Sequence, residues 1–208
     1  MAFIKKQVQP VIEVASKINE VRDCLSLVKQ LSSHDATERR WAARDLADCA
    51  ECAAELMQRL KIETENSVRE VILTSLTRLG DPIAVAGMVD CLRSEDAALR
   101  NEVVEAMKQL PLEVAPIMLE LLADADPDVR IFAVNVLESL CHPDVETWLI
   151  QVICRDDHVN VCATAVDLLG EVGSADAIQP LEQLKSRFSD EPYIQFAADL
   201  ALRRINEH

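Results

Sequence analysis

The feature that most constrains this chain is a short pattern that returns about every thirty residues. In its clearest copy, Arg130 is followed by Ala133 and then by Leu137. The arginine position, here called the marker, falls at residues 39, 69, 100, 130, 162 and 195, so the intervals are 30, 31, 30, 32 and 33 residues. Six copies at nearly constant spacing predict an array of similar units rather than one compact core.

Each marker segment is preceded by a second apolar segment. The four clearest of these cover residues 83–92, 114–122, 145–154 and 177–184, and their apolar residues recur at steps of three and four. This spacing is typical of one buried helix face. Breakers separate the segments: Gly80, Pro82, Pro111, Pro143 and Gly173. Each unit is therefore predicted to be a helix, a short turn and a second helix.

One helical hairpin cannot bury both of its apolar faces, so such units must stack on each other. The chain is expected to form an all-α solenoid of about six hairpins. Their predicted ranges are 19–49, 50–80, 81–111, 112–142, 143–173 and 174–208. Residues 1–18 have a helical apolar pattern and are expected to form an N-terminal helix that caps the first repeat.

The pattern Asp-Pro-Asp-Val-Arg-x-x-Ala-x-x-x-Leu at 126–137 resembles the short HEAT-like repeat, including the repeats of phycobilisome chromophore lyases. The resemblance covers roughly residues 19–205. It implies a right-handed α-solenoid whose second helices line a concave binding surface. It also implies a structural ladder in which marker arginines bond acidic side chains or carbonyls near a turn. The ladder residues are Arg39, Arg69, Arg100 and Arg130, and Cys162 interrupts the series.

Positions one, five and eight beyond each marker are expected to face the concave surface. The predicted binding residues among them are Arg40, Arg44, Glu70, Thr74, Asn101, Glu105, Asn135, Glu138 and Asp167. This row is cationic at its start and acidic or polar in the middle, which would orient a bound peptide by charge. Phe196, Leu200 and the two tryptophans, Trp41 and Trp148, are expected to pack rather than to bind a ligand.

The acidic charge restricts the partners. The chain has 21 Lys and Arg against 36 Asp and Glu, a formal net charge of −15. Residues 97–191 alone carry six basic and eighteen acidic groups. Such a charge disfavours nucleic acid and anionic membranes and favours a protein partner with a basic surface. An ordinary solvated exterior is the competing explanation.

The seven cysteines are odd in number and lack a compact disulfide spacing. Without an apolar signal segment at the N-terminus or a transmembrane run, we expect a cytoplasmic protein with reduced thiols. Cys49 and Cys52 form the one CxxC pair, which is a weak metal signal when it stands alone. Both cysteines are expected to pack as small buried residues.

No catalytic pattern stands out, and no cofactor is expected. None of the histidines, His34, His142, His158 and His208, is followed by glutamate, and the chain lacks a glycine-rich phosphate loop. The leading hypothesis is a non-catalytic scaffold or adaptor that binds a protein partner. One alternative, by analogy of fold, is a bilin lyase-type subunit using Cys141 or Cys162. A second is a thiol-based metal or redox sensor using Cys49 and Cys52.

Overall fold

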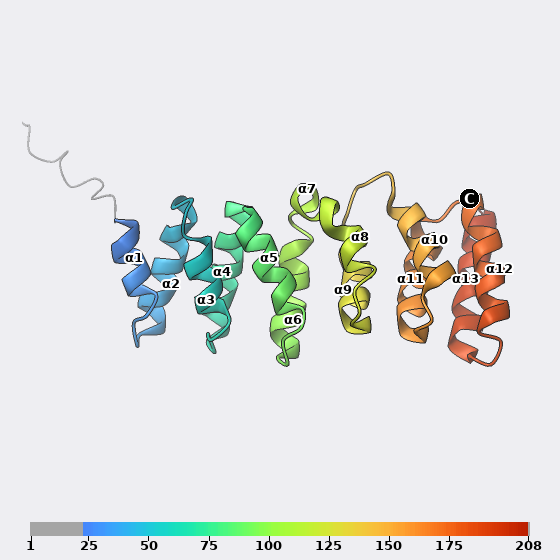
Figure 1. Cartoon of the computed structure of the whole chain (residues 1–208), viewed down its shortest axis with the longest axis horizontal. Coiled ribbons are helices and arrows are strands. Elements are labelled where there is room, and N and C mark those ends of the chain that lie inside the picture. The colour runs from blue at the N-terminus through green and yellow to red at the C-terminus, as the bar shows by residue number, and fades with distance from the viewer. Residues whose placement is uncertain (1–22, 208) are drawn as a thin grey trace, which may run out of the picture.

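The computed structural model describes residues 23–207, and these residues form helices, turns and loops without a strand. The predicted capping helix at 1–18 lies outside the described residues. The helices stand side by side in one row along the long axis of the molecule (Figure 1). The predicted all-α solenoid is confirmed.

Helices alternate between two sets along the chain. The first helices of the successive hairpins are α1 (Cys24–Gln30), α3 (Ala53–Leu60), α5 (Pro82–Cys91), the broken helix α7 (Pro111–Val114), η2 (Ala115–Ile117) and α8 (Met118–Leu121), then α10 (Val145–Arg155), and finally α12 (Ile178–Arg187) after η3 (Ala175–Ala177). The second helices are α2 (Ala36–Asp45) with η1 (Leu46–Asp48), α4 (Asn66–Leu79), α6 (Ala97–Met107), α9 (Pro127–Leu137), α11 (Val159–Val172) and α13 (Pro192–Glu207).

Short polar residues start several of these helices. The carboxylates of Asp35, Asp81, Asp96 and Asp126 each accept a hydrogen bond from a backbone N–H in the following first turn. These N–H groups have no partner within the helix, so the cap stabilises the start of each one. Helix α4 ends at Gly80, whose φ of 57° is readily adopted by glycine. The loop sequences thus fix where the helices begin and end.

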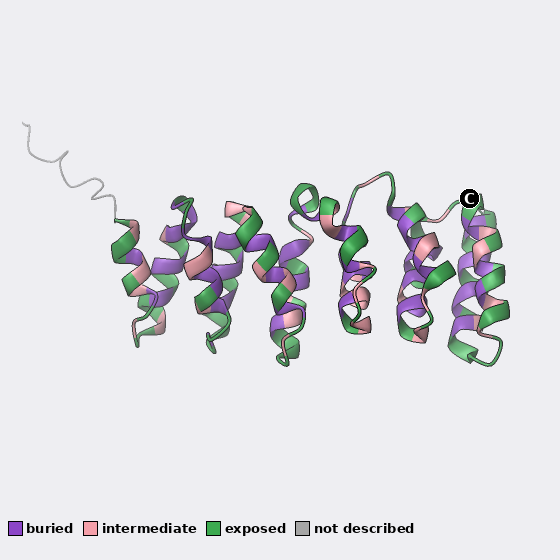
Figure 2. Ribbon diagram, viewed as in Figure 1, coloured by how far each residue is buried: buried purple, intermediate pink, exposed green. Residues whose placement is uncertain are grey.

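The second helices form an unbroken series. Each packs on the next, from α2 through α4, α6, α9 and α11 to α13. Buried residues continue through every hairpin as one hydrophobic core (Figure 2). Because each hairpin is covered mainly by its neighbours, the core extends along the row instead of closing around one centre.

The first helices are less regular. The sequence predicts one helix over 114–122, but the structure divides this segment among α7, η2 and α8. Pro116 lies in η2 and has no N–H to continue an α-helix. Within residues 23–207, α3 packs on α5 and α10 on α12, whereas α8 and α10 lack comparable packing. The first-helix side of the solenoid is therefore interrupted at the fourth hairpin.

Candidate functional site

The second-helix face is the surface formed by the nine predicted binding residues, which lie on or directly after α2, α4, α6, α9 and α11, together with the exposed Tyr193, Phe196 and Leu200 of α13. Eight of the nine predicted side chains are exposed and Asn135 is half-buried. Hollows of about 290, 530 and 460 Å³ lie along this face, between α2 and α4, α4 and α6, and α11 and α13. Arg40, Glu70, Asn101 and Asp167 are among their lining residues. The face is thus accessible and has depressions between successive helices.

The α2 end of this face combines positive charge with an aromatic ring. The guanidinium of Arg44 lies 4.2 Å from the ring centroid of Trp41, and that of Arg40 lies 5.9 Å from it. Trp41, which is expected to pack rather than to bind a ligand, is 42% exposed. Trp148 is buried as expected. Exposed tryptophan beside arginine is a common composition of protein-binding surfaces.

The middle of the face is less acidic than its sequence suggests. Lys108 Nζ lies 3.0 Å from a carboxylate oxygen of Glu105 and 2.8 Å from one of Glu138. The hydrogen bond to Glu138 raises the pKa of Lys108, with Glu105 adding to the effect against the opposing effect of burial. This lysine is fully charged at neutral pH and offsets one of the two negative charges. Lys108 and Glu138 are 30 residues apart in sequence, so this pairing could not be predicted from local patterns.

Aromatic side chains return at the α13 end. Tyr193 donates a hydrogen bond of 2.8 Å to Asp167. Phe196 is 67% exposed and Leu200 is 38% exposed, so the expectation that they pack as core or end-cap residues was wrong. Phe196 follows its marker by one residue, as Arg40 does in the first hairpin, and this position turns toward solvent. The face therefore has an exposed aromatic group near each end.

The marker arginines lie beneath the turns between paired helices. Arg39 donates to the carbonyls of Ser33 and His34 and, through two further bonds, to Glu63. Arg69 donates to Asp96, Asn66 and Glu102. Arg100 donates to the carbonyl of Ser94. Arg130 donates to the carbonyls of Asp124 and Ala125 and to both carboxylate oxygens of Asp156. The fixed fork of the guanidinium lets Arg39 and Arg130 join their own turn to the next hairpin, whereas Arg69 reaches the next hairpin through carboxylates and Arg100 bonds its own turn.

In the fifth hairpin, the arginine that bonds the carbonyls near the turn does not come from the marker position. Cys162 occupies the marker position, and its thiol donates to the carbonyl of Asp156 at 3.2 Å. Arg187, from the end of α12, extends back and donates to the carbonyls of Ile153, Cys154 and Asp156. The sequence left open whether Cys162 loosens this turn or makes a special contact. The structure shows a contact, with the guanidinium supplied by the next hairpin.

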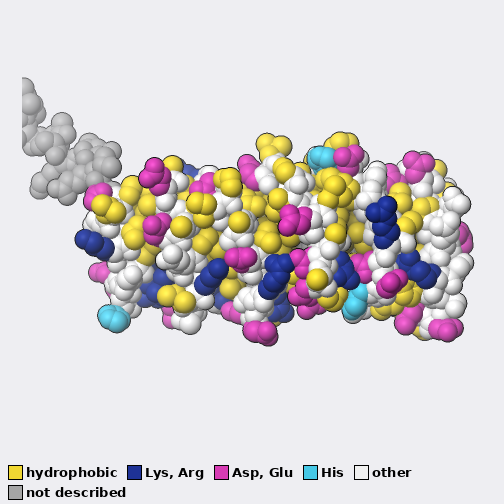
Figure 3. Space-filling view, viewed as in Figure 1, with side chains coloured by type: hydrophobic (Ala, Val, Ile, Leu, Met, Phe, Trp, Pro, Cys, Tyr) yellow, Lys and Arg dark blue, Asp and Glu magenta, His cyan; other side chains and the backbone are white. Residues whose placement is uncertain are grey.

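Two hollows flank the broken first helix of the fourth hairpin. One, of about 800 Å³, lies between α8 and α10 and is lined by Leu122, Trp148, Asp156 and His158 among others. The other, of about 420 Å³, lies between α5 and α8, with Val85 and Leu121 among its apolar residues. Its acidic residues are Asp90, Glu113, Glu120 and Asp124. Figure 3 shows hydrophobic side chains over α5 and α8 with carboxylates beside them.

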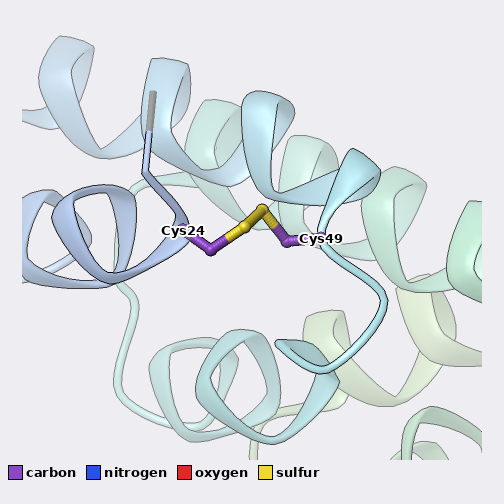
Figure 4. Close-up of a disulfide and its surroundings, with 2 residues drawn as sticks. All are labelled: Cys24 and Cys49. Carbon is purple, nitrogen blue, oxygen red and sulfur yellow. A yellow bond between two sulfur atoms is a disulfide. The ribbon is translucent and has the colours of Figure 1, made fainter. Parts of the chain in front are cut away.

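A disulfide joins Cys24, the first residue of α1, to Cys49 at the end of η1 (Figure 4). The prediction that all seven cysteines are reduced was therefore wrong. The two residues are 25 positions apart in sequence, and only folding brings their Cα atoms to 6.1 Å. This bond also weakens one ground for a cytoplasmic location, because disulfides persist mainly in oxidising compartments.

The sulfur of Cys52 lies close to this disulfide. The Sγ atoms of Cys24, Cys49 and Cys52 all lie within 4.8 Å of one another, and within residues 23–207 they form the one group of three or more side chains suited to hold a metal ion. Cys49 and Cys52 are buried, as expected. A metal binds thiolates, so the disulfide leaves one thiol of this cluster for coordination. The disulfide and a three-thiolate metal site exclude each other.

Comparison with known protein families identifies the repeated helical hairpins. The family model for HEAT repeats matches residues 24–108 and 114–203. No curated protein sequence matches the chain. Among solved structures, the chain is similar to a computationally designed armadillo repeat protein for modular peptide recognition, with 18% identity over 88% of this chain and all of that one, at a TM-score of 0.44.

Two further solved structures are similar at the level of the fold. An engineered protein has 20% identity over 91% of this chain and 98% of its own, at a TM-score of 0.40. The complex of CpcE and CpcF of phycocyanin lyase from Nostoc sp. PCC7120 has 16% identity over 98% and 99%, at a TM-score of 0.37. Among the described residues, no helix has the length and apolar character needed to span a membrane. The matched repeats cover most of the sequence, and the chain belongs to the HEAT repeat family.

Proposed function

We propose that this protein is a non-catalytic scaffold that binds a protein segment along the second-helix face. The observation that carries the proposal is the unbroken packing of α2, α4, α6, α9, α11 and α13, which makes one continuous surface. Hollows and exposed aromatic groups on that surface supply the depressions and anchors that bound segments use. A cytoplasmic location remains part of this proposal on sequence grounds alone.

The charges of the face define the segment it would accept. At the α2 end Arg40 favours an acidic residue, since Arg44 already pairs with Asp45 at 2.6 Å, whereas Glu70 and Asp167 favour basic ones farther along. An extended or helical segment, acidic at one end and basic over the rest, would therefore bind in one direction. The overall charge of −15 gives the partner's basic part a long-range attraction and disfavours nucleic acid.

The experiment is a selection of displayed fifteen-residue peptides on the full chain, followed by affinity measurement with variants. Glu70→Lys combined with Asp167→Lys should weaken the selected basic peptides at least about tenfold, an effect of about 1.4 kcal/mol. The matched control is Glu113→Lys with Glu120→Lys, which makes the same charge change beside the hollow between α5 and α8. Equal weakening by both pairs would remove the second-helix face as the binding surface.

The alternative function is a bilin lyase-type subunit, and the cavity between α8 and α10 favours it. Its volume of about 800 Å³ is within the range of small-molecule sites. Of the two candidate thiols, Cys141 is exposed, whereas burial raises the pKa of Cys162 to about 11 and suppresses its thiolate. Loss of bilin attachment in Cys141→Ser would support the alternative, and unchanged attachment would count against it.

A further inference from the structure

We propose that Cys24, Cys49 and Cys52 form a thiol–disulfide exchange site in which Cys52 displaces Cys24 from Cys49. Two of the three sulfurs are joined in a disulfide, and the third belongs to a free thiol within 4.8 Å of both. Exchange requires a thiol that can reach a disulfide sulfur. Cys49 takes part in both pairings. It is bonded to Cys24 in the present disulfide, and it lies three residues before Cys52 in the CxxC segment.

The backbone favours the second pairing as well as the first. The N–H of Cys52 donates a 3.1 Å hydrogen bond to the carbonyl of Cys49, which closes a turn over the CxxC segment. A turn of this kind keeps its end Cα atoms within about 7 Å. Bridged cysteines usually have Cα atoms roughly 4.4–6.8 Å apart. A Cys49–Cys52 disulfide therefore requires little movement of the backbone.

The reaction is an isomerisation and needs no external oxidant. Cys52 loses its thiol proton, and the thiolate sulfur attacks Sγ of Cys49. The Cys49–Cys52 bond forms as the Cys24–Cys49 bond breaks, and the electron pair of the broken bond leaves with Cys24. Cys24 then takes up a proton. One disulfide and one thiol are present before and after the step.

The surroundings of Cys52 set the conditions for exchange. Burial raises the pKa of this thiol, and the nearby carboxylates of Glu55 and Glu51 raise it further. Thiolate is the attacking form, so the raised pKa slows exchange near neutral pH. Exchange should accelerate by up to about tenfold for each pH unit until the thiol is ionised.

The exchange changes how α1 is held at the end of the row. The Cys24–Cys49 bond ties the first residue of α1 to the connection between η1 and α3. Without it, this seven-residue helix is retained by its packing on α2 and η1, with Leu27 and Leu31 in the core. A helix this short is marginal by itself. The site would thus control the attachment of the N-terminal edge of the solenoid.

The test uses the full chain without added oxidant or reductant. Samples held at pH 7 and pH 9 are alkylated with iodoacetamide, and their disulfides are mapped by proteolysis and mass spectrometry. At pH 9, molecules with an alkylated Cys24 and a Cys49–Cys52 bond are expected to accumulate at least tenfold faster than at pH 7. A Cys24–Cys49 bond that stays intact for hours at pH 9, or that is absent from the purified protein, would overturn the proposal.

The matched control is Cys52→Ser, which keeps the free thiols of Cys91, Cys141, Cys154 and Cys162. In this variant Cys24 should remain unlabelled at pH 9, with far-UV circular dichroism matching the wild type. Labelling of Cys24 at the wild-type rate would assign the exchange to another thiol and refute the role of Cys52. Cys52→Ala repeats the comparison if the serine variant folds poorly. The outcome is independent of peptide binding, so it stands or fails separately from the proposed scaffold function.

Discussion

The first and fifth hairpins satisfy similar turn carbonyls with guanidinium groups of different origin. In the first, Arg39 comes from the marker position of its own hairpin and also binds the carboxylate of Glu63. In the fifth, Arg187 comes from the following hairpin and binds carbonyls and the thiol of Cys162. The comparison teaches that in these two hairpins the turn carbonyls receive a guanidinium whether or not the marker residue supplies it.

The two solutions differ in electrostatic character. Glu63 has a fully buried side chain that accepts hydrogen bonds from Arg39, from Arg59 and from the backbone N–H groups of Thr64 and Glu65. Its charge is compensated only while those donors remain. Arg187 is exposed and leaves no buried carboxylate behind when it is removed. The first hairpin should therefore be more sensitive to mutation and to pH.

The largest expected effect is that of Arg39→Ala. Removing Arg39 leaves the buried carboxylate of Glu63 with Arg59 and two backbone N–H groups as its partners and without its bidentate cation, so the free energy of unfolding should fall by about 3 kcal/mol. Urea denaturation followed by circular dichroism measures this. The control is Arg100→Ala, because within residues 23–207 Arg100 bonds a carbonyl and no carboxylate; a loss of about 1–2 kcal/mol is expected. Equal losses would contradict the importance of Glu63.

The next effect is a pH dependence that belongs to Glu63. Burial by itself would raise the pKa of this carboxyl, but the hydrogen bonds from Arg39, the Glu65 N–H and Arg59 outweigh it and lower the pKa to about 2. A lowered pKa contributes stability above the unfolded value of about 4.3, and this stability is lost as the pH falls toward 2. The loss amounts to about 3 kcal/mol at about 1.36 kcal/mol per pH unit.

Comparison with Glu63→Gln isolates this contribution from the other carboxylates. The difference in unfolding free energy between wild type and variant should shrink by about 3 kcal/mol between pH 6 and pH 2. Urea denaturation at a series of pH values provides the measurement. A difference that stays constant over this range would show that Glu63 does not carry a strongly lowered pKa.

The smallest expected effect is that of Arg187→Ala in the fifth hairpin. It leaves the carbonyls of Ile153, Cys154 and Asp156 without this donor, and water can replace part of the contact. We expect a loss of about 1–2 kcal/mol with no added pH dependence near pH 4. The control is Lys185→Ala, in the same turn of α12 as Arg187. It removes a surface ion pair with Asp199 of α13 and should lower the free energy of unfolding by less than about 0.5 kcal/mol. If Arg187→Ala lowers the free energy of unfolding no more than Lys185→Ala does, Arg187 does not replace the marker arginine in the fifth hairpin.

Much of the fold could be predicted because the repeat is local. Helical periodicity, aspartate caps and breakers all act within a few residues, and the marker spacing implies stacking. The break in the first helix of the fourth hairpin was missed, although Pro116 was its visible signal. The burial of Cys49 and Cys52 could also be predicted, because their positions follow the apolar pattern.

The sequence alone determined the helical array, its approximate period and the exposure of eight of the nine predicted binding residues, because each depends on neighbours within one hairpin. Only the tertiary structure decided contacts between hairpins. These include the bridge from Lys108 to Glu138 and the replacement of the fifth marker arginine by Arg187. The Cys24–Cys49 bond lies within the first hairpin, but it too depends on how α1 packs against η1. The partners in these contacts are 25–31 residues apart in sequence, and their pairing depends on how helices and hairpins pack on each other, which no local pattern encodes.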